Sequence, residues 1–404
     1  MTAILRDVTS TTPGHDEVRN RAEALVALVR EHALENERNR RIADPVVEAF
    51  RTSQLHRAMR PRRAGGWELG FEALLDISRT LSPACASTAW VFGLYVVHNW
   101  LLALFPPDLQ DEIWGDNPDA LVSGSYAPAA AARPVDGGYR LSGRFAFSSG
   151  CPGADWNLCG AMVPRGPEGG LVPAFTIIPK RDYTIDFESW RTVGLAGTGS
   201  CDVLLDDVLV PARRVLTFPE AASGNAPGIA LNRNPMYRLP MLTCIPYTLS
   251  MPPVGAAKGA VDQFVEENRR RETRGAIVAG GKKVADYQTV QKRVGEADAL
   301  IDSSIAIAYR DVQEAQAEIV RDGVTSLAMR MRNRRSHAFM AQQAERAVDL
   351  VMGAAGGRCM QIDHPLQRAW RDVHTANSHI SLNFDAVMSM IGQYRFGLEP
   401  QGQY

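Results

Sequence analysis

The sequence predicts an α+β protein with several domains, in which a helical part, a β part and a second helical part follow one another along 404 residues. Three observations predict this order. Apolar residues recur at helical spacing over residues 1–118, alternate with polar residues over 119–225, and return to helical spacing over 226–404. We therefore expect an N-terminal helical domain, a central β domain and a C-terminal helical bundle with these boundaries.

The first part contains at least five expected helices. One begins near Asp16, with apolar residues on one face and charged residues on the other. Another begins at Asp44, where an aspartate can cap the helix and the following proline suits its first turn. The remaining helices are expected over 71–81, 86–104 and 107–114.

The first clear sequence signal of the β part is the turn Asp136-Gly137-Gly138. The turn separates two short runs of strand-like residues, 132–135 and 139–147. Later strands are expected over 156–163, 174–178, 183–187 and 201–210. Residues 219–236 are rich in Pro, Gly, Asn and Ala, and we expect a linker or an exposed excursion there.

The last part is expected to be a bundle of long helices. Over 284–320 the apolar residues repeat at intervals of three and four, which indicates one long helix with a narrow apolar seam. Further helices are expected over 335–352 and 364–392, separated by the small-residue run 353–357. A continuous helix over 364–392 would place His379 and Asn383 on one face.

Composition favours a soluble enzyme or binding protein. Hydrophobic residues make up 45% of the chain and charged residues 22%, and the net charge of −1 indicates neither a nucleic-acid nor a membrane partner. The six cysteines show no CxxC spacing, and the first residues lack the apolar core of a signal peptide. We expect a cytoplasmic protein. The most apolar run, 89–105, is short for a membrane span and contains His98, so we expect a buried helix.

Familiar catalytic motifs are missing from the sequence. No Walker loop, no GxSxG elbow and no HExxH pair occurs, and we expect no metal site. The glycine-rich run 194–200 precedes a strand instead of opening a helix, which argues against a dinucleotide fingerprint.

Several polar residues in apolar or small-residue surroundings remain as candidates. Taken singly, each has an ordinary explanation: His98 as a core histidine, and the serine pairs as turn residues. The candidates are His98, Ser123 with Ser125, Ser148 with Ser149, and the stretch 370–383 with its Arg371-Asp372 pair, His374, His379 and Asn383.

In combination, these segments resemble the acyl-CoA dehydrogenase fold. Within that fold they are most similar to the oxygenase components of two-component flavin-dependent monooxygenases, which hydroxylate p-hydroxyphenylacetate, a steroid-derived phenol or indole-3-acetate. The resemblance covers nearly the whole chain. It is carried by residues 85–90, 97–105, 123–128, 135–143, 148–156, 193–200 and 364–372, together with His379.

The resemblance implies a function and its cofactor. The chain would receive reduced FMN or FAD by diffusion from a separate NAD(P)H:flavin reductase and would form a C4a-hydroperoxyflavin with O2. It would then hydroxylate an aromatic small molecule, phenolic or indolic. Enzymes of this fold are commonly homotetramers whose bundles pack together, and the apolar seam is compatible with such an assembly.

The resemblance also implies roles for individual residues. Ser148 or Ser149 would hold the flavin N5, and His379 would be the base near the substrate, with His98 and Ser123 or Ser125 lining the pocket. Trp90 and Tyr126 are expected as aromatic walls, and Asn383 as a substrate contact. The expected flavin contacts are Ser123, Ser125, Ser149, Trp156, Thr198, Ser200 and Arg238, the last beside N1.

Three alternatives stand beside this interpretation. An acyl-CoA dehydrogenase or oxidase needs a carboxylate base, yet residues 377–383 contain no acid, and neither does the interval between Glu220 and Asp262. The oxygen acceptor could instead be a heteroatom such as an amine or a thioether sulfur. A non-catalytic flavin-binding protein is the third alternative.

Overall fold

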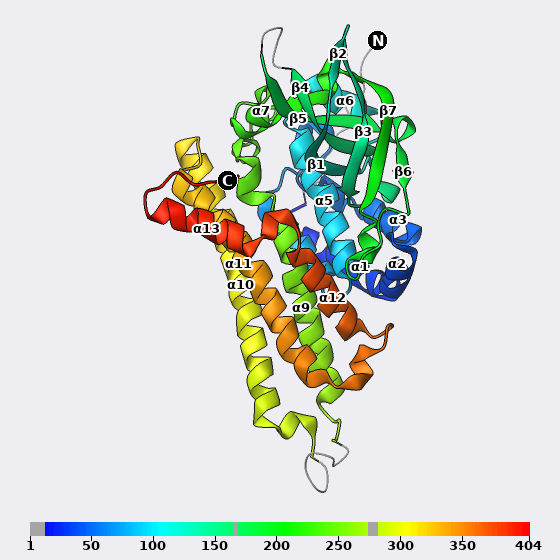
Figure 1. Cartoon of the computed structure of the whole chain (residues 1–404), viewed down its shortest axis with the longest axis vertical. Helices are drawn as coiled ribbons and strands as arrows, with labels where there is room; N and C mark the ends of the chain where they lie inside the picture. The colour runs from blue at the N-terminus through cyan, green and yellow to red at the C-terminus, as the bar shows by residue number, and fades with distance from the viewer. Residues whose placement is uncertain (1–12, 165–168, 274–281) are drawn as a thin grey trace.

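The computed structural model describes residues 13–164, 169–273 and 282–404. Helices form the first part, two sheets the middle and long helices the last part, in the order that the sequence predicts. Figure 1 shows the sheets at one end of the molecule and the long helices α9–α12 at the other, with α5 between them. Among the described residues, no helix is both long and apolar enough to cross a membrane.

The first part packs its helices around one buried helix, α5. All of its residues are buried, because it is apolar on every side and has α4, α9 and β1 around it. The helices of this part are α1 (His15–Glu31), α2 (Ala33–Asn39), α3 (Asp44–Ser53), α4 (Phe71–Leu81), α5 (Ala86–Leu102) and α6 (Pro107–Asp116).

The middle part consists of two four-stranded sheets that share one apolar core. One sheet has the strand order β1-β4-β5-β8, with β1 and β4 parallel, and the other has the order β2-β3-β7-β6. A bridge between Gly124 and Ser149 joins β1 to the end of β3. The strands are β1 (Val122–Ala131), β2 (Arg133–Val135), β3 (Gly138–Ser148), β4 (Trp156–Pro164), β5 (Leu171–Pro179), β6 (Thr184–Asp186), β7 (Cys201–Pro211) and β8 (Val215–Thr217).

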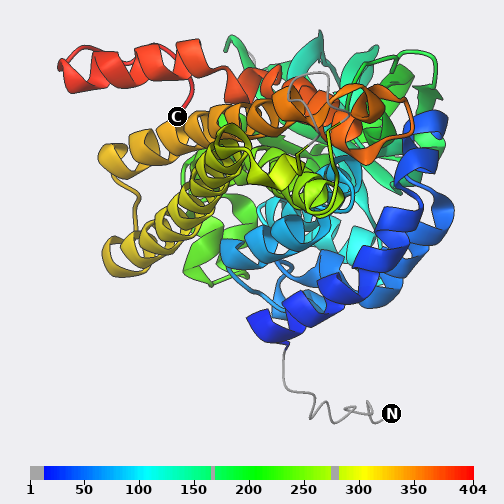
Figure 2. The same ribbon diagram turned by 90° about the horizontal axis from the view of Figure 1, so that it is seen from below.

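The last part is built on four helices that lie side by side (Figure 1). Figure 2 shows that the joined ends of α10 and α11 extend to one side of the molecule, together with α13. The long helices are α9 (Tyr247–Asn268), α10 (Gln288–Asp322), α11 (Leu327–Ala355) and α12 (Pro365–Asn377), and the shorter ones are α7 (Phe218–Ala222), α8 (Met241–Cys244) and α13 (Phe384–Arg395). The predicted seam of α10 is buried at Ala297, Ile301, Ala308 and Val312.

Three expectations from the sequence are wrong. Residues 123–128, which taken alone are typical of a turn, belong to strand β1. The segment 219–236 is not an exposed linker, because Ala221, Ala226, Ile229 and Met236 are buried against the main core. The predicted helix 364–392 is broken between α12 and α13 by a single 3-10 turn, Ile380–Leu382.

Candidate functional site

A cluster of hydroxyl groups lies where the end of β3 meets the loop before β7. Ser149 Oγ is 2.7 Å from Ser200 Oγ, which is 2.6 Å from Thr198 Oγ1. The indole Nε1 of Trp90, on the buried helix α5, donates to Ser149 Oγ at 3.3 Å. The backbone N–H of Gly150 also donates to the carbonyl of Thr198. Three separate segments therefore meet at Ser149.

His379 adds a fourth segment to this cluster. Its ring meets the ring of Trp90 edge-on, with 5.8 Å between centroids and 63° between planes. His379 lies at the break after α12, where its Nδ1 accepts the backbone N–H of Ser381 at 3.1 Å. This hydrogen bond leaves the proton of the neutral ring on Nε2. Burial and the charge of Arg334 lower the pKa of His379 to about 4, so the ring is neutral at ordinary pH.

His98 lies near Gly124, the bridge partner of Ser149. A Cβ placed on Gly124, the bridge partner of Ser149, would lie 3.5 Å from His98 Cε1. His98 Nδ1 donates to the carbonyl of Val122 at 2.5 Å, so the neutral ring carries its lone pair on Nε2. That Nε2 atom is buried and has no hydrogen-bond partner within the described chain. Burial lowers the pKa of His98 to about 4.

Tyr126 lies beside the His98 ring. Its ring centroid is 5.7 Å from that of His98 and 5.0 Å from that of Phe175, and its hydroxyl group is buried without a partner in the part described. Burial raises the pKa of the Tyr126 phenol, which is therefore neutral and can donate. A buried acceptor and a buried donor side by side, both without a partner, are typical of a binding site.

Phe147 presents an exposed aromatic ring directly before the two serines. Its side chain is 70% exposed, and its backbone has a φ of +63°, which is uncommon for a bulky residue. The pairing of β3 with β7 shifts register between Phe145 and Ser148, and such a bulge re-aims the side chains that follow it. The ring of Phe147 meets Trp190 edge-on at 6.2 Å.

The two adjacent serines have different environments. Ser148 is fully buried and donates to Asn157 Oδ1 at 2.5 Å, and Ser123, also fully buried, donates to the same oxygen at 2.6 Å. Both hydroxyls are thus engaged between the strands. This geometry argues against Ser148 and Ser123 as ligand contacts and favours Ser149.

Three other predicted contacts have local roles in this structure. Ser125 donates to the carbonyl of Ala146 at 2.6 Å, which joins the two sheets. The ring of Trp156 carries the guanidinium of Arg214 on one face, at 5.1 Å. Asn383 is exposed and caps α13 by accepting the N–H of Ala386, so it does not share a helix face with His379.

Arg238 is exposed and lines a hollow of about 460 Å³ with Arg233 and residues 225–227, 229 and 230. The neighbouring Met236 accepts a hydrogen bond from Trp100, ten residues beyond Trp90 on α5 and therefore about 15 Å further along the helix. The place of Arg238 beside the flavin N1 stays a prediction.

The Arg371-Asp372 pair, prominent in the sequence, clamps α12 to the loop of the hydroxyl cluster. Asp372 Oδ1 accepts the N–H of Leu195 at 2.6 Å, and Arg371 donates to the carbonyl of Val193 and to Glu37. Burial raises the pKa of Asp372 to about 6. A Cβ on Gly194 would lie 2.1 Å from the carbonyl oxygen of Arg371, so this close approach requires glycine. The clamp fixes the helix that leads to His379 against Thr198 and Ser200.

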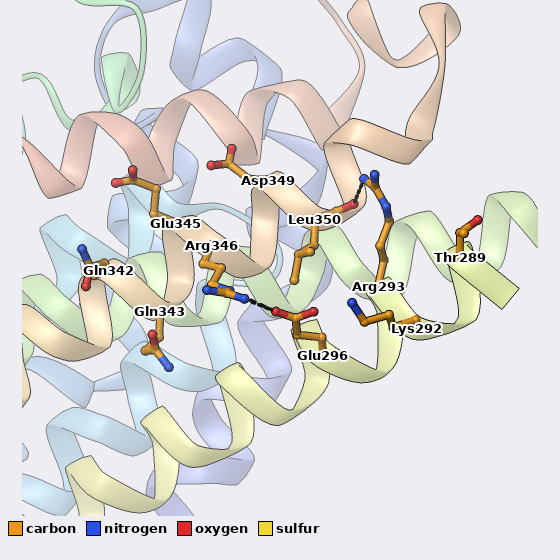
Figure 3. Close-up of a pocket in the computed structure, with 10 residues that line it drawn as sticks. All are labelled: Thr289, Lys292, Arg293, Glu296, Gln342, Gln343, Glu345, Arg346, Asp349 and Leu350. Carbon is orange, nitrogen blue, oxygen red and sulfur yellow. Dashed lines mark hydrogen bonds and ion pairs between the residues drawn. The ribbon is translucent and has the colours of Figure 1, made fainter.

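Figure 3 shows a larger hollow, of about 770 Å³, between α10 and α11 on the outer side of the bundle. Its lining is charged, and Arg346 pairs with Glu296 across it. Near it, Glu345, Asp349 and His374 lie close enough to hold a metal ion, as do Glu267, Cys359 and His364 elsewhere in the described chain. The first group is already hydrogen-bonded: His374 and Trp370 contact Asp349, and Asn377 donates to Glu345.

Comparisons with known proteins agree with this architecture. The family of the acyl-CoA dehydrogenase C-terminal domain matches residues 247–384. The oxygenase component of the FADH2-dependent resorcinol hydroxylase of Rhizobium sp. strain MTP-10005 is 43% identical over 398 residues, 97% of each chain. The HsaA oxygenase subunit of Rhodococcus jostii RHA1 is 36% identical and covers 94% of this chain and 98% of its own.

The chain belongs to the flavin-dependent oxygenase components with the acyl-CoA dehydrogenase fold. Solved structures of this oxygenase family superpose closely on the whole chain. The 3-HSA hydroxylase of Rhodococcus sp. RHA1 has a TM-score of 0.89 at 35% identity, covering 96% of this chain and 98% of that one. XiaF from Streptomyces sp., in complex with FADH2 and glycerol, has a TM-score of 0.87 at 27% identity, covering 96% and 97%.

Membership of the oxygenase family agrees with the missing acid. Within the described structure, none of Trp90, Ser149, Thr198, Ser200 and His379 has a hydrogen bond or ion pair with a carboxylate. An α-proton of a thioester would therefore find no carboxylate base among these residues.

Proposed function

We propose that this chain is the oxygenase component of a two-component monooxygenase that uses reduced FMN or FAD and O2 to hydroxylate the ring of a phenol. The observation that carries the proposal is the contact of Trp90 with both Ser149 and His379, together with the unpartnered His98 Nε2 eight residues further along α5, in a chain 43% identical to a resorcinol hydroxylase oxygenase component. Resorcinol and its alkyl derivatives are the first substrates to test.

The residues around Ser149 fit a planar flavin. Phe147 offers an exposed aromatic face two residues before Ser149, and the loop 193–200 supplies Ser200 as a further donor. Thr198 donates its hydroxyl proton to the carbonyl of Leu195 and can only accept. A strained backbone next to an exposed ring suits a surface that a ligand covers. Bound reduced flavin supplies the activation of dioxygen. Ser149 would hold N5, and the indole of Trp90 orients that hydroxyl.

The two histidines would divide the work on the substrate. His98 Nε2 bears a lone pair and would accept the proton of the phenol, which makes the ring more electron-rich. His379 carries its proton on Nε2 and would donate a hydrogen bond into the site. His379 was the expected base from the sequence. The hydrogen bond from Ser381 to its Nδ1 favours His98 for that role instead.

The donor role of Tyr126 would complete the substrate end. Its neutral hydroxyl lies next to His98 and can donate to the oxygen of the bound phenolate. A charge-assisted hydrogen bond of this kind is worth about 1.5–3 kcal/mol. The site therefore offers one proton acceptor and one donor to the same phenolic oxygen.

A separate NAD(P)H:flavin reductase supplies the reduced flavin in this proposal, and the protein works in the cytoplasm as a homotetramer. The name of the Rhizobium relative, an FADH2-dependent oxygenase component, supports the need for a reductase partner. All six cysteines are buried and free, which suits a reducing compartment.

The test supplies reduced FMN or FAD with air to the purified chain and a panel of phenols and indoles. The proposal expects a hydroxylated product that requires both flavin and substrate, with resorcinol-type phenols best. If no phenol or indole yields product while acyl-CoA thioesters reduce bound FAD, the chain is a dehydrogenase. Product formed only from amines or thioethers would replace ring hydroxylation with heteroatom oxygenation.

A further inference from the structure

Arg334 on α11 is a buried cation without a carboxylate partner in the described chain. Arg334 is 6% exposed, and burial lowers the pKa of its guanidinium to about 10, which leaves the group charged at neutral pH. A buried charge is costly, so its hydrogen bonds must compensate for the lost water. The acceptors of those hydrogen bonds indicate what the residue does.

Both acceptors are backbone carbonyl groups from the last part of the chain. Arg334 Nη1 donates to the carbonyl of Ser381 at 3.1 Å, and Nε donates to the carbonyl of Gln403 at 3.2 Å. Ser381 is the residue whose N–H donates to His379 Nδ1. A continuous chain of hydrogen bonds thus runs from Arg334 through Ser381 to the His379 ring.

The segment that carries His379 needs such an anchor. It is a break between two helices, and the turn Ile380–Leu382 is one 3-10 turn. Ile380 is 85% exposed and contributes little packing, whereas Leu382, at the end of the turn, is 2% exposed and packs in the main core. The Arg334 hydrogen bond is thus a second attachment of the turn, beside the side chain of Leu382. The guanidinium attaches the turn to the long helix α11, which lies in the bundle.

We propose that Arg334 is the positioning residue for His379: it fixes the turn 380–382 through the Ser381 carbonyl and so keeps the imidazole with Nδ1 occupied and Nε2–H free for the site. The catalytic consequence rests on the proposed function, whereas the effect on the His379 ring does not. Arg334 acts through the turn and has no contact with the hydroxyl cluster in the described structure.

Arg334 also acts on His379 through its charge. Among the described groups, it is the charge that lowers the pKa of His379, in addition to burial. The two effects are separable, because lysine keeps the charge without the planar fork, whereas the shorter, neutral glutamine keeps neither the charge nor the fork.

Arg330, one turn earlier on α11, is a matched control. It donates to the carbonyl of Tyr404 and lies over that ring at 5.0 Å, so it holds the same carboxyl-terminal segment but not the turn. Arg330→Gln should loosen residues 401–404 and leave the His379 ring unchanged.

The experiment measures the tautomer and the pKa of His379 by NMR on the full-length protein with labelled histidine, assigned with His379→Gln. The wild type should show one tautomer, Nε2–H, without protonation down to about pH 5. In Arg334→Gln the tautomers should mix and the pKa should rise toward its ordinary value. Arg334→Lys should keep the low pKa but lose the single tautomer.

Product formed per flavin oxidised is the second readout. It should fall at least about fivefold in Arg334→Gln and remain unchanged in Arg330→Gln. An Nδ1–H tautomer in the wild type, an unchanged His379 in both Arg334 variants, or an equal effect of Arg330→Gln would overturn the inference. Because the NMR measurement needs neither flavin nor substrate, a failure of hydroxylation alone would remove the proposed function and leave the positioning role standing.

Discussion

Adjacent serines at the end of β3 give the sharpest test of the site. Ser149→Ala removes the hydroxyl that accepts from Trp90 and lies 2.7 Å from Ser200, whereas Ser148→Ala removes one that donates to the buried Asn157. The two variants delete the same atom from neighbouring residues. Each therefore serves as the control for the other.

The structure gives the magnitudes. Ser149→Ala leaves the buried indole N–H of Trp90 without an acceptor, which should cost about 1–3 kcal/mol of folding stability. Loss of one hydrogen bond to N5, worth about 1 kcal/mol, should lower the ratio of product to hydrogen peroxide roughly fivefold. Ser148→Ala should cost about 1 kcal/mol of stability, because Asn157 still accepts from Ser123, and leave that ratio unchanged.

The assay compares hydroxylated product, measured by chromatography, with hydrogen peroxide, measured by a peroxidase reaction, at fixed reduced flavin. Urea unfolding of both variants gives the stability change separately. If Ser148→Ala uncouples the reaction and Ser149→Ala does not, the assignment of Ser149 to the flavin is wrong.

Three further predictions follow from the same geometry. Asp372→Asn should remove a pH dependence of folding stability. The pKa of Asp372 is about 6 in the folded protein, above its ordinary 3.8, so the neutral carboxyl group stabilises the fold at low pH and this contribution is lost as pH rises through 6. The wild type should lose about 1–2 kcal/mol more than the variant between pH 5 and 8 in urea titrations, and parallel curves would refute this. Replacing His98 with Gln should reduce the hydroxylation rate about a hundredfold or more, since it removes a general base, and a rate within a factor of three of wild type would exclude that role. Phe147→Ala should weaken reduced-flavin binding about tenfold in a fluorescence titration, because about 1–1.5 kcal/mol of ring contact is lost, and unchanged affinity would show that the ring does not contact flavin.

Much of the fold could be predicted because its signals are local. The helix start at Asp44-Pro45, the turn at 136–138 and the seam of α10 each depend on residues close in sequence, and the structure contains the helix, hairpin and long helix that they predict. The expected cap at Asp44 is wrong, because the N-cap of α3 is Ala43 and Asp44 is the first residue of the helix, without a side-chain cap hydrogen bond. Strand β1 was missed because its serines and glycine resemble a turn, and its burial depends on the partner strand β4.

The site could be predicted only in part, because its geometry depends on contacts between distant segments. Motif order brought Trp90, Ser149 and His379 to attention, but the bulge at Phe147 decides which serine faces Trp90. The break at His379 was missed because side-chain capping by His379 and Asn383 competes with the helix that the periodicity predicts. Arg334 gave no local signal, since in sequence it belongs to an arginine-rich run.

The central claim is that this chain transfers oxygen from O2 to an aromatic ring through reduced flavin. The most direct measurement supplies the chain with chemically reduced flavin, resorcinol and isotopically heavy dioxygen, and analyses the product by mass spectrometry. Oxygen transfer through reduced flavin predicts one heavy oxygen atom in a newly formed ring hydroxyl, with none taken from water. A product that takes its oxygen from water, or flavin oxidation that yields only hydrogen peroxide with every phenol and indole tried, would contradict it.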